Sequence, residues 1–161
     1  MGDSTQNPEP RTQNLARRTQ GSELSVGEGK AVRMKQISVF VENRPGRLKV
    51  LMEVLNKADI NIRALSIADT ADFGIVRMIL SDTVQGLEAI RAAGFAASTN
   101  DVLRVEIPDQ PGGLLKTVAE PLAAAGVNVE YVYAFADRPQ EHAVVVLKVG
   151  DIDAAEKLIG R

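Results

Sequence analysis

The segment Val39-Phe-Val-Glu-Asn-Arg-Pro-Gly-Arg-Leu48 has a counterpart 66 positions further along the chain, Val105-Glu-Ile-Pro-Asp-Gln-Pro-Gly-Gly-Leu114. Two further pairs follow in the same order: residues 60–62 match 127–129, and residues 75–78 match 144–147. The register is constant inside each segment and shifts only between segments. This pattern indicates duplication of a folded unit, because insertions collect in loops and spare regular elements.

The first unit has the pattern strand, helix, strand, strand, helix. Residues 37–41 alternate between apolar and other positions, as in a half-buried strand. Residues 48–55 place apolar side chains at i, i+3, i+4 and i+7, which predicts an amphipathic helix. Two strands are expected over 60–69 and 73–80, and a helix capped by Asp82 follows them. A short fourth strand over 95–101 completes the unit.

The second unit repeats this plan from a strand over 102–107 to a last helix that opens at Asp151. The predicted fold is α+β, with two tandem ferredoxin-like βαββαβ modules and antiparallel sheets. The chain ends after the last helix, so the second module lacks a clear final strand. The expected modules are 34–101 and 102–161. About 65 residues make a small core, so we expect the modules to share an interface.

Residues 1–33 are rich in Ser, Thr, Gln, Asn, Gly and Pro and contain no aromatic residue. They show no sustained hydrophobic period, and we interpret them as a disordered tail. Deletion of the chain up to Met34 is therefore expected to leave the melting temperature unchanged.

The Pro-Gly pairs at 45–46 and 111–112 lie where a strand ends and a helix begins. Free main-chain N–H groups and the positive end of the helix dipole favour a carboxylate there. Glycine lets a ligand approach the main chain closely. The alternative is a tight turn without a ligand, with Asn43 or Asp109 as the N-cap. Arg44 and Arg47 are the best candidates for binding an anion beside the first turn.

Asn61 and Asn128 each lie between two β-branched residues at the start of the second strand of a unit. Asparagine is depleted in strands, and its amide both donates and accepts hydrogen bonds, as recognition of an amino acid requires. The alternative is a side-chain cap on the turn that precedes the strand.

These motifs resemble those of the ACT domain family, in which Asp or Asn-x-Pro-Gly-x-Leu is followed by a helix and by Gly-Val/Ile-Asn-Ile/Val. The resemblance covers nearly all of residues 36–159. The whole chain resembles stand-alone tandem ACT proteins. Asp59 stands where the family has Gly, and this replacement is expected to alter that turn. The resemblance implies an effector site between modules. Its expected residues are Asn43, Arg44, Pro45, Gly46, Arg47, Leu48, Asn61 and Ile62 in the first unit and Asp109, Gln110, Pro111, Gly112, Gly113, Leu114, Asn128 and Val129 in the second.

Two other features carry specific expectations. Tyr131, Tyr133 and Phe135 share one face of a strand. A packed core or a module interface is favoured over base stacking, because the chain is acidic and the first unit has no equivalent series. The interval from Pro111 to Asn128 is one residue longer than that from Pro45 to Asn61 and contains Pro121. A bulge at this proline is therefore predicted.

Composition excludes several classes of site. There is no cysteine and only one histidine, and the formal net charge is −2. Disulfides, thiol chemistry and a histidine-rich metal site are excluded, and neither nucleic acid nor a membrane is an expected partner. The sequence predicts no cofactor, no metal site and no catalytic residue.

The resulting hypothesis is a cytoplasmic, non-catalytic sensor that binds a free amino acid as allosteric effector between ACT modules. It is expected to be a homodimer and to act on an unidentified metabolic enzyme. The alternatives are a small ferredoxin-like enzyme, such as an acylphosphatase-like hydrolase or a cofactor-free isomerase, and a scaffold without a ligand. The sequence does not identify the amino acid.

Overall fold

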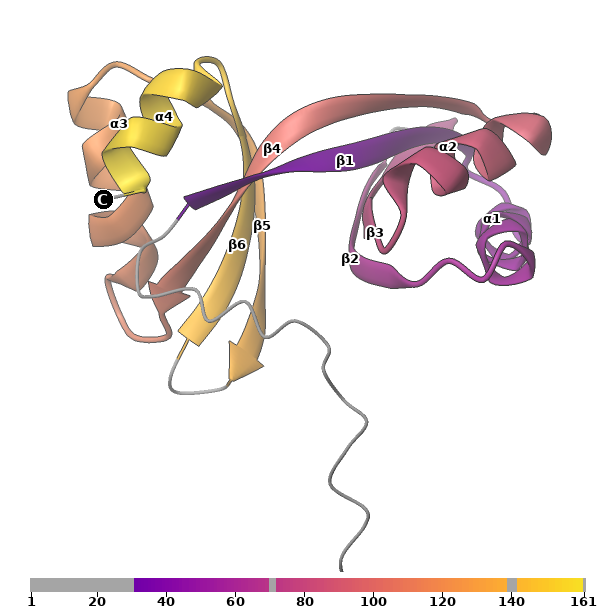
Figure 1. Ribbon diagram of the computed structural model, residues 1–161, viewed down its shortest axis with the longest axis horizontal. Coiled ribbons are helices and arrows are strands. Elements are labelled where there is room, and N and C mark those ends of the chain that lie inside the picture. The colour runs from indigo at the N-terminus through magenta and orange to yellow at the C-terminus, as the bar shows by residue number, and fades with distance from the viewer. Residues whose placement is uncertain (1–30, 70–71, 139–141, 161) are drawn as a thin grey trace, which may run out of the picture.

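The computed structural model describes residues 31–69, 72–138 and 142–160, which form one antiparallel sheet flanked by helices (Figure 1). The strand order is β2-β3-β1-β4-β6-β5. In chain order the elements are β1 (Ala31–Glu42), α1 (Arg47–Lys57), β2 (Ile62–Asp69), β3 (Phe73–Leu80), α2 (Thr83–Ala92), β4 (Ala96–Pro108), the π-helix η1 (Leu115–Ala119), α3 (Glu120–Ala124), β5 (Val129–Arg138), β6 (His142–Val149) and α4 (Ile152–Ile159).

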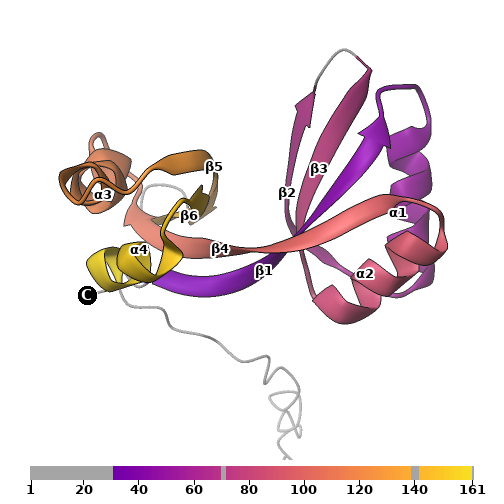
Figure 2. The ribbon, with the colours of Figure 1, turned by 90° about the horizontal axis from the view of Figure 1, so that it is seen from above.

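The strands β1 and β4 are long and belong to both modules. They pair with each other from Ala31 opposite Val105 to Phe40 opposite Ala96. Figure 2 shows them crossing side by side from one module to the other. Beyond this pair, β1 is joined by β3 and β2, and β4 by β6 and β5. Each half of the sheet therefore has the ferredoxin-like strand order, and the predicted pair of ferredoxin-like modules with antiparallel sheets is confirmed.

The final strand of the second module comes from the start of β1. Residues 31–35 pair with 101–105 of β4, in the place where a strand after the last helix would lie. Among the described residues, no strand follows α4. Sequence analysis assigned residues 31–33 to the tail, and the structure corrects this assignment. The remaining tail residues, 1–30, lie outside the described residues.

Side-chain contacts anchor this segment to the second module. Ala31 is buried in the core of that module together with Val105 and Ile159. Arg33 forms ion pairs with Asp153 and with Glu156 of α4, the latter at 2.7 Å. The guanidinium holds the pKa of the Asp153 carboxyl below its usual range. The segment is therefore a structural part of the module, although its sequence is too short to show a strand period.

In each module, the helices pack against one face of the sheet and form a hydrophobic core with it. The core of the first module contains Ile37, Val39, Val41, Leu51, Leu55, Ile60, Val76, Met78, Leu80, Ile90 and Phe95. The core of the second contains Ala31, Leu103, Val105, Ile107, Val118, Leu122, Val145, Leu147, Val149, Ala155 and Ile159. Asp82 caps α2 by accepting a hydrogen bond from Gln85 N, as predicted, and Asp151 caps α4 in the same way.

The predicted bulge at Pro121 is confirmed. A π-helix over Leu115–Ala119 precedes this residue, and Glu120 N donates to Leu115 O across five positions. Because proline has no N–H and its ring crowds the preceding turn, one extra residue in a wider turn lets the helix continue. In the first module the uninterrupted helix α1 takes the equivalent place.

On the helix-free face, the two modules meet through a buried polar network. Gln36 is fully buried; its Nε2 donates to Tyr131 Oη at 2.7 Å, and its Oε1 accepts from Tyr133 Oη at 3.0 Å. Asn100 also donates to Tyr131 Oη, and the Arg77 guanidinium lies 4.1 Å from the ring centroid of Tyr131. Tyr131 and Tyr133 therefore lie at the module interface, as expected, whereas the side chain of Phe135 lies outside the described residues.

The first prediction concerns the strand supplied by the N-terminal segment. A chain that begins at Gln36 should lose about 2 kcal/mol or more of unfolding free energy relative to one that begins at Ala31, because it loses ladder hydrogen bonds, a core side chain and the ion pairs of Arg33. Urea denaturation of the two truncated chains measures the difference. Equal stability would show that residues 31–35 are dispensable, and the expectation of an inert segment up to Met34 would stand.

The second prediction concerns Tyr133. Burial raises its pKa to about 12, because the ionised form is poorly solvated. Because folding raises the pKa of Tyr133, its contribution to the unfolding free energy is fully present below the ordinary value near 10. This contribution is lost as the pH rises towards about 12. Tyr133→Phe should be less stable at neutral pH by about 1 kcal/mol, but its stability should depend less on pH above about 10.

Urea denaturation as a function of pH tests this difference. Tyr131→Phe is the matched control, since it keeps Tyr133 and should keep the alkaline loss of stability. The chain has two tyrosines, so the ultraviolet absorbance of tyrosinate in Tyr131→Phe follows Tyr133 alone. Ionisation near the ordinary value in that variant would contradict the prediction.

Candidate functional site

The first Pro-Gly turn joins β1 to α1 and leaves the start of the helix open. Arg44 N donates to Glu42 O at 2.8 Å, and Arg47 N donates to Arg44 O. Gly46 has φ of 86° and is the N-cap of α1 without a side-chain cap. The alternative in which Asn43 caps the helix is therefore wrong. The left-handed backbone explains the glycine, and the first helical N–H groups are not covered by a capping side chain.

The second Pro-Gly turn repeats the first, bond for bond. Gln110 N donates to Pro108 O at 2.9 Å, Gly113 N donates to Gln110 O at 3.0 Å, and Gly112 has φ of 85°. The difference lies at Gly113, which occupies the position of Arg47. A Cβ at Gly113 would lie 2.1 Å from Pro108 O, so the turn has no room for a side chain there.

The two arginines of the first turn have different environments. Arg47 Nε lies 3.1 Å from Glu42 Oε2, and its guanidinium lies 4.9 Å from the centroid of the Phe95 ring. Arg44 is exposed and forms no ion pair within the described part of the chain. Of the two predicted anion-binding residues, Arg44 is thus available to a ligand, while Arg47 is held by its neighbours.

A cavity of about 160 Å³ lies between this turn and the neighbouring strands. It is lined by Val41, Glu42, Asn43, Arg44, Leu48, Ile67, Gly74 and Val76. Three of these, Asn43, Arg44 and Leu48, were predicted site residues. The lining from β3 was not predicted, because it depends on cross-strand register: Gly74 lies opposite Val41 and Val76 opposite Val39.

Asn61 and Asn128 occupy equivalent positions at the starts of β2 and β5. Ser81 N donates to Asn61 O and Gly150 N to Asn128 O, each at 2.9 Å. Both side chains are exposed, and in the described residues neither amide has a hydrogen-bond partner. The interpretation of these amides as side-chain caps is therefore wrong. A recess of about 220 Å³ lies beside Asn61.

The turn before Asn61 keeps its shape despite the Asp that replaces glycine. Asp59 has φ of 56° and Gly126, at the same position in the second module, has φ of 70°. Aspartate is one of the few residues with a side chain that tolerates this region. The replacement therefore leaves the turn unaltered.

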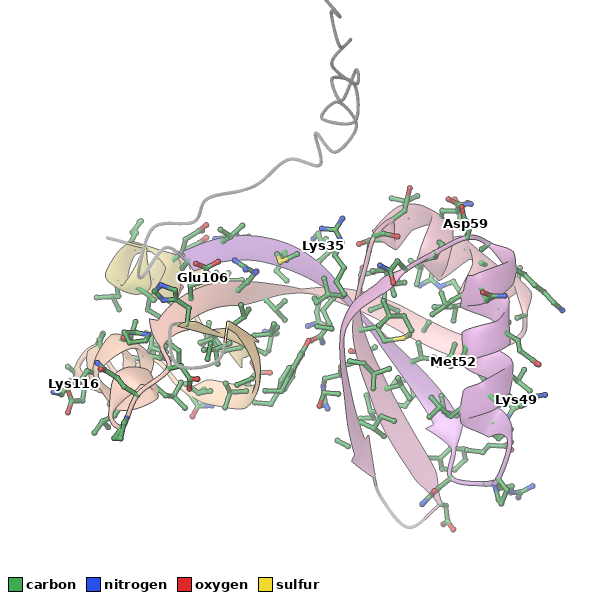
Figure 3. The ribbon with its side chains drawn as sticks, turned by 90° about the horizontal axis from the view of Figure 1, so that it is seen from below. Lys35, Lys49, Met52, Asp59, Glu106 and Lys116 are labelled. Carbon is green, nitrogen blue, oxygen red and sulfur yellow. The ribbon has the colours of Figure 1, made fainter. Side chains whose placement is uncertain are left out.

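Within one module, the Pro-Gly turn and the asparagine lie far apart. The turn lies beside Ile67 near the end of β2, whereas Asn61 precedes the start of that strand. Eight strand residues span about 25 Å. Figure 3 shows this separation: Lys49, close to the Pro-Gly turn, lies at one end of α1, and Asp59, close to Asn61, lies at the other end. The structure thus brings the turn to β2 and β3, and does not bring it to Asn61 of its own module.

The outer strands β2 and β5 each have one unpaired edge in the sheet. Leu65 and Ile67 on β2 and Val132 on β5 are exposed apolar side chains on these strands. Leu65 and Ile67 lie opposite Met78 and Val76, on the helix-covered side of the sheet. Tyr133, by contrast, contacts Gln36 on the other face and is remote from the cavity.

Other classes of site lack support in the part of the chain that the structure describes. No cluster of three His, Cys, Asp or Glu side chains there could hold a metal ion. No described helix is long and apolar enough to cross a membrane.

Comparisons with known proteins agree with the architecture. The family model described as "ACT domain pair" matches residues 32–160. Protein BT0572 from Bacteroides thetaiotaomicron is 40% identical in sequence, with a TM-score of 0.74 over 80% of this chain and 87% of that chain. No curated protein matches.

Two more distant structures share the fold. The regulatory subunit of aspartate kinase from Thermus flavus is 17% identical, with a TM-score of 0.56 over 81% of this chain and 94% of that one. The ligand-free regulatory subunit from Thermus thermophilus is 15% identical, with a TM-score of 0.58 over 80% and 94%. The duplicated Pro-Gly turns, the shared sheet and the family match together show that the chain belongs to the ACT domain pair family.

Proposed function

We propose that this protein is a non-catalytic cytoplasmic sensor that binds a free amino acid at the Pro-Gly turn of the first module. The cavity beside this turn carries the proposal: it joins an uncapped helix start and an exposed arginine to a pocket of small-molecule size. Family membership supports a regulatory role, since two of the similar structures are regulatory subunits of aspartate kinase.

The ligand would be held by groups of both charges. Its carboxylate accepts from main-chain N–H groups near Gly46 and from the Arg44 guanidinium, because both supply positive potential at one end of the cavity. Its ammonium group needs acceptors, and the free amide oxygen of an asparagine provides one. Asn61 of the same module is too remote to do so.

A second copy of the chain would supply an asparagine close to the turn. Antiparallel pairing of β2 with β2 of a second copy, about a two-fold axis near Leu65, places the end of one strand beside the start of the other. Asn61 of the second copy then lies beside the Pro-Gly turn of the first. The unpaired edge and the exposed Leu65 and Ile67 support such a homodimer. Ligand would favour the dimer by mass action and so alter contacts with a metabolic enzyme.

A catalytic role has less support than binding. An enzyme of this size needs a positioned acid and base within one pocket. Among the described lining residues, Glu42 is the one carboxylate, and it is paired with Arg47 at 3.1 Å. A ligand-free scaffold would leave the cavity and the exposed Arg44 without a role.

The third prediction tests the site by calorimetric titration with each of the twenty amino acids. Arg44→Ala and Asn61→Ala should each weaken the best ligand roughly tenfold, because each removes a charge-assisted hydrogen bond worth about 1.4 kcal/mol or somewhat more. Both side chains are exposed, so the fold should be unaffected.

Asn128→Ala is the matched control, since it makes the same change at the equivalent position of the second module and should bind like the wild type. Sedimentation should show a larger dimer fraction with ligand than without it. If no amino acid binds, or if Arg44→Ala and Asn61→Ala both bind as the wild type does, the proposed site is wrong.

A further inference from the structure

We infer that the bound amino acid carries a branched aliphatic side chain of the size of valine, leucine or isoleucine. This inference rests on the proposed function and adds the chemical class of the ligand. It is drawn from the lining, charge and size of the cavity beside the first Pro-Gly turn.

The interior of the cavity is aliphatic. Val41 and Val76 are almost completely buried and form its floor, and Leu48 and Ile67 form exposed walls. The wall side chains are 40% and 48% exposed, so a ligand covering them removes apolar surface from water. None of the described residues that line the cavity is aromatic.

The polar side chains of the lining, Glu42, Asn43 and Arg44, all come from the turn at the rim. Glu42 is paired with Arg47, so it does not offer a free carboxylate to a lysine side chain. Arg44 and the turn bind the carboxylate that every amino acid shares. Away from this rim, a charged or amide side chain would lie against Val41 and Val76 without a polar partner, which is unfavourable.

The volume of the cavity indicates the size of side chain that it accommodates. A cavity of about 150 Å³ lined by aliphatic side chains accommodates benzene, and the present cavity is about 160 Å³. The space suits a group of four to six carbon atoms, roughly. Aliphatic walls without a ring favour a branched chain within this range.

Gly74 keeps the cavity open and supplies the sharpest variant. It lies on β3 opposite Val41, and a Cβ added there would lie 3.8 Å from Ile67 Cγ2 and 3.6 Å from Ala68 O. These are ordinary contacts, so a side chain can be built without a clash at its first atom. Valine at this position would extend into the cavity, and valine is favoured in strands.

The fourth prediction compares amino acids by calorimetric titration of the full chain. Leucine, isoleucine or valine should bind at least about tenfold more tightly than alanine, threonine, lysine and aspartate. Threonine is the decisive comparison with valine, because the two side chains have the same shape and threonine has a hydroxyl group in place of one methyl group. Gly74→Val should weaken the best aliphatic ligand at least tenfold while keeping the wild-type circular dichroism and Tm.

Ile67→Ala provides a second variant, since the exposed Ile67 contributes little to the core and its loss removes one cavity wall. It should weaken leucine more than alanine. Tighter binding of a polar, charged or aromatic amino acid would overturn this inference and leave the proposed function standing, as would unchanged binding by a folded Gly74→Val. Binding of none of the twenty would reject the proposed function and this inference with it.

Discussion

The antiparallel pairing of β1 with β4 is the constraint on which the rest of the molecule depends. Both strands run through both modules. The fourth strand of each module is therefore part of the same long strand that forms the first strand of the other module. Neither half has a complete sheet without this pair. Because the pairing is antiparallel, β1 and β4 run in opposite directions, and the Pro-Gly turns at their ends lie at opposite ends of the molecule (Figure 2).

This arrangement dictates where a site between modules can form. The shared strands occupy the centre of the sheet, and β2 and β5 remain as its edges. A turn and an asparagine that are separated by the length of β2 can meet only across an edge, where antiparallel pairing reverses the strand direction. In the proposed site, the asparagine therefore comes from a second chain, although one chain already contains two modules.

The network around Gln36 fixes how the two halves of the sheet lie relative to each other. A buried amide is costly unless its donors and acceptors are paired. Here its Nε2 donates to Tyr131 and its Oε1 accepts from Tyr133, both on β5, whereas Gln36 itself lies on β1. Correct hydrogen bonding thus requires one particular approach of β5 to the central strands. These polar contacts lie beside a small apolar cluster of Ile79, Val102 and Val146, against which Tyr133 packs, so both kinds of contact contribute to this interface.

Sequence patterns predicted what depends on local periodicity and repetition. The helix caps at Asp82 and Asp151 and the π-helix before Pro121 follow from residues close in sequence, or from one unit compared with the other. The strand at residues 31–35 was missed for two reasons. Its partner in β4 is more than sixty positions away, and five residues are too few to show a strand period. The role of Gly74 was missed for a similar reason, since it depends on the register of β3 against β1 and β2.

The strand β1 also joins the parts of the molecule that a ligand could affect. Val41 lies in the cavity floor, Gln36 holds the module interface, and Arg33 binds α4 of the other module. These three residues lie on one continuous strand, so a single element connects the cavity with the module interface and with the far module. Interfaces of packed and hydrogen-bonded groups tend to shift between discrete arrangements. A regulator built on a shared strand can therefore pass a local change to its far module without a hinge.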